Sequence, residues 1–207
     1  MATGTRRARE IENLRRAILD AARELFYEQD YRAVSMRKIA EKVEYSPAAI
    51  YRYFSDKEEI LFHLIDEGFQ QLNSRFKELE IIADPVDRMR LGGKAYTEFA
   101  LTQPHYYRLM FQLERNEMMA KYMPQCTNAN DAFGFVIHAM QEAMDKGIFK
   151  QDLPAVVVAA SIWAGLHGAI SLALTGHLHI MMAAEHDAIL FEYVAEGLLR
   201  QNLVDAT

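Results

Sequence analysis

Hydrophobic residues recur at spacings of three and four along most of the chain, which predicts helices rather than strands. The first such run lies between residues 11 and 26, with arginine and glutamate on its polar side. Its apolar positions are Ile11, Leu14, Ile18, Ala21, Ala22, Leu25 and Phe26. No segment shows a convincing period-two alternation of a strand. The pattern therefore predicts an all-α protein.

Two short helices are predicted next, each preceded by a serine that can cap it. Ser35 precedes a run with Met36 and Ile39 on its apolar side, and serine is a favourable N-cap residue. Ser46 precedes Pro47, which suits the first turn of a helix because its fixed φ is already helical. With the first run, these segments form three helices within the first 56 residues.

The rest of the chain predicts six longer or more irregular helices. They are expected at residues 57–79, 84–103, 104–113, 128–146, 153–175 and 185–203. Gly92 and Gly93 weaken the second of these, and Gly147 ends the fourth. About nine helices result, without an internal repeat or a low-complexity linker.

One stretch is apolar enough to raise the question of a membrane span. Residues 153–184 contain no Asp, Glu, Lys or Arg, and their length alone permits a span. Pro154, Gly176 and several serines and histidines interrupt the run, so a buried helix followed by a loop is favoured and no membrane is expected. The N-terminus lacks the apolar core of a signal peptide, and the one cysteine, Cys126, cannot form an internal disulfide. We expect a cytoplasmic protein.

Charge is distributed unevenly along the 207 residues. Residues 1–56 contain 11 Lys/Arg and 9 Asp/Glu, whereas residues 57–207 contain 12 and 20, so net charges of +2 and −8 make up the total of −6. The basic positions of interest are Arg6, Arg7, Arg9, Arg37, Lys38, Lys42, Arg52 and Lys57. Such an excess suits double-stranded nucleic acid, because neutralising phosphates releases counterions. A solvated charged face is a serious alternative for so small a net charge, so charge alone does not identify a nucleic-acid-binding surface.

The spacing of the two short helices is more informative than the charge. Two short helices joined by the turn "VEYS" have the layout of a helix-turn-helix, whose second helix enters the major groove of DNA. The stretch "SMRKIAEKVEYSPAAIYRYFSDKEEIL" resembles the DNA-binding signature of the TetR family of bacterial transcriptional regulators, and the resemblance extends from Ile11 to about Leu64. Further on, "QPHYYRLMF" and "WAGLHG" resemble elements of one C-terminal subgroup.

The resemblance implies which residues contact DNA. These are Ser35, Arg37, Tyr45, Ser46, Pro47, Ala48, Tyr51, Tyr53 and Lys57. Tyr51 and Lys57 match family positions that contact phosphates, and a phenol and an ammonium are suitable donors. Arg37 is the best candidate for a bidentate contact to guanine. Ile50 and Phe54 are expected to pack the small domain instead.

One position departs from the family pattern. Glu44 stands in the turn where the family usually has glycine. If the backbone has a positive φ there, a residue with a side chain costs about 1 kcal/mol, and the carboxylate also lies where phosphates are expected. We expect a weaker DNA affinity or a different turn.

The resemblance implies two domains, a helix-turn-helix DNA-binding domain at residues 1–56 and a helical effector-binding and dimerisation domain at residues 57–207. In the family, two copies dimerise through their last two long helices, and the two DNA-binding domains bind a roughly palindromic operator. Two sets of small residues at four-residue spacing suit close helix approach. They are Ala160, Ala164 and Gly168, and Gly165, Ala169 and Ala173.

Aromatic and sulfur-containing residues of the larger domain are the candidates for binding a partly apolar small-molecule effector. They are Tyr96, Phe99, Tyr107, Phe111, Phe133, Ile137, Met140, Trp163 and His167. Residue by residue, a position in the core is the more common role of such side chains.

Catalysis and metal binding have little support in the sequence. His138 and Glu142 share a helix face and His177 is close to His179, but neither pair has a third ligand at definite spacing. No phosphate-binding loop and no nucleophile motif is present. We therefore expect no enzyme activity, no cofactor and no metal.

Two functions from different classes remain open. The first is a ligand-responsive DNA-binding regulator, most often a repressor in this family, which releases its operator when the effector binds. The second is a dimeric, helical small-molecule-binding protein whose DNA binding is weak or lost. A DNA-bound organiser without an effector is a variant of the first.

Overall fold

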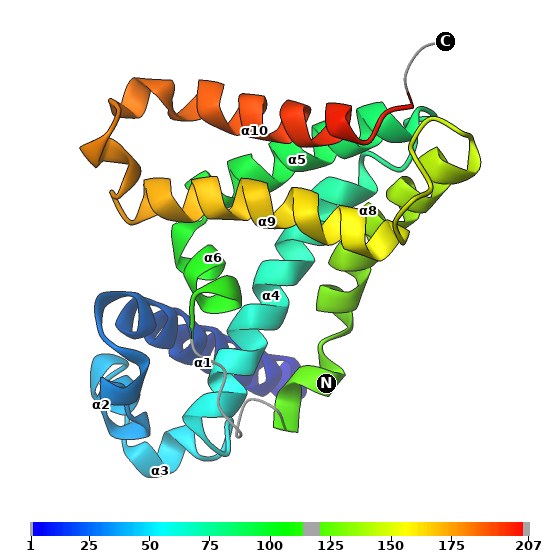
Figure 1. Ribbon diagram of the computed structural model, residues 1–207. Helices are drawn as coiled ribbons and strands as arrows, with labels where there is room; N and C mark the ends of the chain where they lie inside the picture. Colours follow the sequence, from blue (N-terminus) through cyan, green and yellow to red (C-terminus); the bar gives the residue numbers. More distant parts are fainter. Residues whose placement is uncertain (1, 114–120, 205–207) are drawn as a thin grey trace. The chain divides into compact units, whose positions relative to one another are not determined.

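The protein is described by a computed structural model that covers residues 2–113 and 121–204, with side chains from residue 6 onward. Within these residues it contains nine α-helices and no strand, and an isolated bridge joins Phe149 to Leu203. The all-α prediction is confirmed. Figure 1 shows the course of the chain.

The α-helices are α1 (Ala2–Glu28), α2 (Met36–Lys42), α3 (Pro47–Ile50), α4 (Lys57–Lys77), α5 (Pro85–Thr102), α6 (Pro104–Phe111), α8 (Thr127–Asp145), α9 (Ala155–Leu174) and α10 (Asp187–Gln201). The 3₁₀ turns are η1 (Tyr31–Ala33), η2 (Met123–Gln125), η3 (Leu178–Ile180) and η4 (Ala184–His186). The predicted helices agree with these bounds to within a few residues, except that α1 begins well before Ile11.

The chain forms two compact units. The first unit comprises Met1–Phe69 and His105–Thr127, and the second comprises Gln70–Pro104 and Asn128–Thr207. The predicted domain boundary after residue 56 stays a prediction.

The first unit is built around the apolar side of α1. This side is buried from Ile18 onward, whereas Ile11 is 45% exposed. Ile39 of α2, Ile50 of α3 and Phe54 are almost fully buried, as the apolar pattern predicts. These buried side chains pack α2 and α3 against the neighbouring helices, and the polar sides of α2 and α3 face solvent.

Charged side chains fix α1 to two other helices of the first unit. Arg16 donates two hydrogen bonds of 2.8 and 2.9 Å to the carboxylate of Glu67 on α4 and also pairs with Asp20 at 2.7 Å. Because of the bond from Arg16, the pKa of Asp20 lies below its ordinary value. Arg23 donates to the hydroxyl of Tyr106 on α6 at 2.9 Å. Both carboxylates are partly exposed, so these contacts orient helices more than they stabilise the fold.

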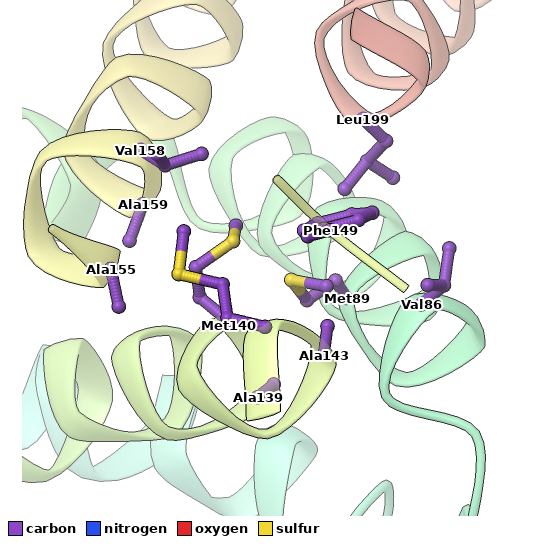
Figure 2. Packing of buried hydrophobic residues seen from close by; sticks show 11 residues of the cluster. Val86, Met89, Ala139, Met140, Ala143, Phe149, Ala155, Val158, Ala159 and Leu199 are labelled. Carbon is purple, nitrogen blue, oxygen red and sulfur yellow. The ribbon is translucent and has the colours of Figure 1, made fainter. Parts of the chain in front are cut away.

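The second unit has its core where α5, α8, α9 and α10 converge (Figure 2). The buried cluster comprises Val86, Met89, Ala139, Met140, Ala143, Met144, Phe149, Ala155, Val158, Ala159 and Leu199. At the edge of the unit, Arg88 of α5 pairs with Glu142 of α8 at 2.8 Å. Arg90 of α5 pairs with Glu196 of α10 at 2.8 Å and holds the pKa of that carboxyl at about 2.

The two glycines in α5 do not interrupt the helix. Gly92 is buried, and a Cβ there would lie 3.0 Å from Cε1 of Phe135, whose ring stacks on that of Phe76 at 4.6 Å. The glycine therefore allows a close approach of α8 to α5. The intrinsic weakness predicted for this helix is offset by packing.

α9 and α10 lie side by side and run in opposite directions (Figure 1). A Cβ at Gly165 would lie 2.5 Å from Cδ1 of Leu198, so the two helices touch at the glycine. Among the described residues, α9 is long and apolar enough to cross a membrane, with a mean hydropathy of 1.8 over 18 residues and only 28% of that window buried. One such helix is weak evidence for a span.

Candidate nucleic-acid interface and effector cluster

The turn between α2 and α3 has the hydrogen-bond pattern of a Schellman ending. The amide of Glu44 donates to the carbonyl of Glu41 at 3.2 Å, and the amide of Tyr45 donates to that of Ala40 at 2.9 Å. This ending requires a left-handed residue after the helix, and Glu44 has φ of +60°. Glu44 thus adopts the left-handed backbone conformation that glycine favours.

α3 begins directly after this turn and is short. The hydroxyl of Ser46 accepts a hydrogen bond from the amide of Ala49 at 3.3 Å, and Pro47 occupies the first turn. Ser35 caps α2 in the same way, through the amide of Lys38 at 3.3 Å. Each hydroxyl still has a proton that it can donate to a phosphate.

The residues predicted to contact DNA lie mainly on the surface. Tyr45 and Tyr51 are 50% and 55% exposed, so neither ring fills the core. The other exposed members are Ser35, Arg37, Ser46, Pro47 and Ala48. Tyr53 and Lys57 are half-buried. The set thus follows α2, the turn and α3, as a reading face requires, while its contact with DNA stays a prediction.

Several basic side chains of this region have partners within the protein. Arg37 pairs with Glu41 at 2.8 Å, Lys42 pairs with Glu24 at 2.8 Å, and Lys38 donates to Gln29. The bond from Lys42 lowers the pKa of Glu24. Because exposed ion pairs contribute only about 0–1 kcal/mol, a phosphate or a guanine can replace the carboxylate at little cost.

Lys57 has a larger structural role than the sequence indicates. Its ammonium donates to the carbonyls of Tyr31 at 2.9 Å and Val34 at 3.1 Å, and lies 4.1 Å from the centre of the Tyr31 ring. These contacts join the start of α4 to the segment that precedes α2. A phosphate contact by Lys57 therefore has to share the ammonium with the backbone.

Arg52 belongs with the candidate contacts, although the sequence showed it only as part of the basic excess. It is the second residue after α3, between Tyr51 and Tyr53, and is exposed. In the part of the chain that the structure describes, its guanidinium has no hydrogen bond or ion pair. Exposure, which a single sequence does not show, is the signal that identifies it.

A chain of hydrogen bonds joins α5 and α9 in the second unit. The hydroxyl of Tyr96 lies 2.8 Å from Nδ1 of His167 and accepts a bond from Nε1 of Trp163 at 3.3 Å. Nε2 of His167 lies 3.4 Å from the hydroxyl of Ser171. Burial lowers the pKa of His167 below its ordinary value.

Aromatic rings surround this chain of bonds. The rings of Trp163 and His167 lie 5.0 Å apart, and Phe133 of α8 meets Trp163 edge-on at 5.4 Å. Tyr96 is buried, Trp163 and His167 are half-buried, and Phe133 is 37% exposed. We name Tyr96, Phe133, Trp163 and His167 the aromatic cluster. It combines flat apolar surface with hydrogen-bonding groups, which suits a small-molecule site.

The other predicted effector residues are placed differently. Phe99 and Met140 are fully buried and Ile137 packs against the core of the second unit, so these three serve the core. Tyr107 and Phe111 belong to the first unit, where Phe111 meets Tyr107 and Phe69 at ring distances of 5.3 and 5.6 Å.

Two candidate metal pairs have other partners. Glu142 binds Arg88 and Lys146, at 2.8 and 2.7 Å. His179 pairs with Asp187 at 3.0 Å, and Nδ1 of His177 lies 2.8 Å from the hydroxyl of Thr175.

Two family models match most of the chain. Residues 18–64 match "Bacterial regulatory proteins, tetR family", and residues 89–198 match "Tetracyclin repressor-like, C-terminal domain". Among curated proteins, the HTH-type transcriptional regulator HbdR of Aromatoleum sp. (strain CIB) is 34% identical over 90 residues. That match spans 42% of this chain and 38% of the relative.

Solved structures share the fold over almost the whole chain. The fatty acid degradation regulator FadR of Bacillus halodurans has a TM-score of 0.72 at 19% identity, over 89% of this chain and 94% of that one. SmeT, the repressor of the Stenotrophomonas maltophilia multidrug efflux pump SmeDEF, has a TM-score of 0.70 at 20% identity, over 93% and 91%. The TetR family transcriptional regulator PfmR of Thermus thermophilus has a TM-score of 0.67 at 21% identity, over 88% and 97%.

Proposed function

Because the chain belongs to the TetR family of bacterial transcriptional regulators and has its DNA-binding domain, we propose that it is a ligand-responsive repressor in the cytoplasm. A homodimer binds a palindromic operator and releases it when a small molecule binds the second unit. The observation that carries this proposal is the exposed face from Ser35 to Tyr51, built on a capped α2, a Schellman turn and a capped α3.

The operator is read by this face. Arg37 is exposed and its carboxylate partner is weakly held, so it is free to turn to the edge of a guanine in the major groove. The hydroxyl of Tyr51 and the guanidinium of Arg52 each donate a hydrogen bond to a phosphate. The small residues Pro47 and Ala48 allow close approach to thymine methyl groups.

Effector binding is assigned to the aromatic cluster. A partly apolar, flat molecule can lie against Trp163 and Phe133 while it exchanges a hydrogen bond with His167 or Tyr96. Since the operator-bound and released states then differ in their affinity for the effector, binding shifts the equilibrium between them.

The structure supports one of the two small-residue stripes of α9 as the dimer seam. Gly165, Ala169 and Ala173 pack within the unit, Gly165 directly on α10. Ala160 and Ala164 are exposed, and no described atom lies within 4 Å of a Cβ at Gly168.

Apolar neighbours enlarge this open stripe. On α9 they are Val156, 52% exposed, and Leu172, 46% exposed. On α10, Ile189 and Tyr193 are 65% and 76% exposed. Exposed apolar side chains on both helices suit an interface, and a second copy with the same helices is the partner that we propose.

The test selects binding sites from a random duplex pool with the purified protein and compares the enriched duplex with a scrambled one at two salt concentrations. We expect a two-fold motif and strong discrimination. Tyr51→Ala should weaken binding to all duplexes, whereas Arg37→Ala should mainly reduce the preference for the enriched one. Weak binding that is equal for every sequence would instead support the second function, a helical small-molecule-binding protein that has lost DNA recognition. Glu44 is the residue that favours this alternative, because its carboxylate opposes DNA phosphates.

A further inference from the structure

Tyr122 lies outside every predicted site, yet it touches the start of the helix that follows the DNA-reading face. It is 8% exposed and belongs to the first unit. Its hydroxyl lies 3.1 and 3.3 Å from the two carboxylate oxygens of Asp56. Its ring stacks on Phe62 of α4, with 5.8 Å between centroids and 25° between planes. Ring and hydroxyl together fix Tyr122 against the first two turns of α4.

Asp56 is the residue that caps α4. One of its carboxylate oxygens accepts a hydrogen bond from the amide of Glu59 at 2.8 Å. Lys121, next to Tyr122, donates to the tyrosine hydroxyl at 2.9 Å and lies 3.9 Å from the same carboxylate. The cap of α4 is thus held from the other side by residues 121 and 122.

The first turn of α4 in turn holds the segment before α2. Lys57 donates to the carbonyls of Tyr31 and Val34, and Glu58 accepts from the hydroxyl of Tyr31 at 2.6 Å. Val34 directly precedes Ser35, the N-cap of α2. A shift of the first turn of α4 therefore moves the N-terminus of the helix that bears Arg37.

We propose that Tyr122 is a positioning residue for operator binding. Its bond to Asp56 holds the first turn of α4, and through Lys57 and Glu58 this turn sets the orientation of α2 on the DNA. The inference rests on the proposed function, since it assigns to Tyr122 a part in that same DNA contact. A bidentate contact tolerates little displacement, because both of its hydrogen bonds depend on one planar orientation.

The test uses the full chain with Tyr122→Phe, which keeps the ring on Phe62 and removes only the hydroxyl. The control is Tyr106→Phe, which removes another hydroxyl of the first unit, one that accepts a hydrogen bond from Arg23 and interacts with Glu67. We expect the Tyr122 variant to bind the enriched duplex about tenfold more weakly, equivalent to about 1.4 kcal/mol, with scrambled duplex bound as before. The control should bind both duplexes like the unmodified protein.

Hydrogen exchange of the DNA-free proteins gives a second readout that does not depend on the operator. In Tyr122→Phe, amides of residues 31–42 and 57–60 should exchange faster, while those of α1 stay as slow as before. Unchanged exchange there, or operator affinity within about twofold of the unmodified protein, would overturn the inference. If the unmodified protein does not prefer its enriched duplex, the proposed function fails. Exchange then decides separately whether Tyr122 positions α2.

Discussion

Glu44 is the residue whose backbone most clearly conflicts with its side chain. Within the described residues, three helices end with a left-handed residue: α2 at Glu44, α8 at Gly147 and α9 at Gly176, with φ of +60°, +69° and +75°. Glycine adopts this conformation without a steric penalty, whereas a residue with a Cβ does not. The same ending is thus made twice with the favourable residue and once without it.

Glu44→Gly should raise the free energy of unfolding by about 1 kcal/mol, because it removes the steric penalty at positive φ. Urea unfolding measures this. Glu44→Ala separates backbone from charge, since alanine keeps the Cβ and should not add stability. The reverse change, Gly147→Glu, should lower stability by a similar amount, because a Cβ there has open space around it and the positive φ is the main obstacle. A Glu44→Gly protein no more stable than the original would contradict the strain.

His63 is a second residue whose surroundings have a measurable consequence. Arg15 of α1 donates to its Nε2 at 3.0 Å, so that nitrogen is the acceptor of a neutral ring. The Arg15 guanidinium also lies 4.6 Å from the centre of the Phe54 ring. Burial, and then the charge of Arg15, lower the pKa of His63, while Glu59 and Asp66 act in the opposite direction.

A lowered histidine pKa determines the sign of the pH dependence. In the unfolded state His63 has the ordinary histidine pKa of 6.5, so near and below this pH the unfolded state binds more protons than the folded state. The stability that the neutral His63 contributes is therefore complete above pH 6.5 and is lost as the pH falls below it. Between about pH 8 and pH 5 the urea midpoint should fall more for the original protein than for His63→Gln, which cannot titrate. Equal shifts in both proteins would refute a contribution from His63.

At the scale of elements, glycines decide how closely helices approach. In the first unit, a Cβ at Gly68 of α4 would lie 2.6 Å from Sδ of Met110 and 3.3 Å from Cβ of Tyr106, both on α6. Real side chains do not come so close, so α4 and α6 cross where only a hydrogen fits. The sequence pattern predicts both helices but not their contact, because the partner of a glycine is far away in the chain.

Gly68→Ala should lower the free energy of unfolding by about 1–3 kcal/mol, since the added methyl group forces Met110 or the backbone of α6 to move. Gly134→Ala on α8 is the control. No described atom lies within 4 Å of its Cβ position, so the helix propensity of alanine should raise stability by about 0.5–1 kcal/mol. Urea unfolding of both variants tests the difference, and a Gly68→Ala protein of unchanged stability would show that the crossing yields easily.

At the scale of the whole molecule, the proposed homodimer predicts that operator affinity depends on dimerisation. When one DNA-binding domain of a dimer is bound, the other is held at a high effective concentration near the second half-site. A monomer has no such advantage. Ala164→Arg places a charge in the open stripe of α9 and should produce a monomer in size-exclusion chromatography with light scattering. Operator affinity should fall at least about tenfold. Ala83→Arg, on the exposed connection before α5, should stay dimeric. A dimeric Ala164→Arg protein would place the interface elsewhere.

By itself the sequence determined the helices, the serine caps of α2 and α3, the family resemblance and the departure from glycine at Glu44. Each of these depends on neighbours within a few residues or on a local motif, and such information is complete in a short window of the chain. Tertiary structure decided the rest. It decided which small residues of α9 pack on α10 and which stay exposed, that Lys57 donates to backbone carbonyls, and that Tyr122 contacts Asp56. They depend on which distant residues meet and on which surfaces stay exposed, and these follow from packing in three dimensions rather than from sequence spacing.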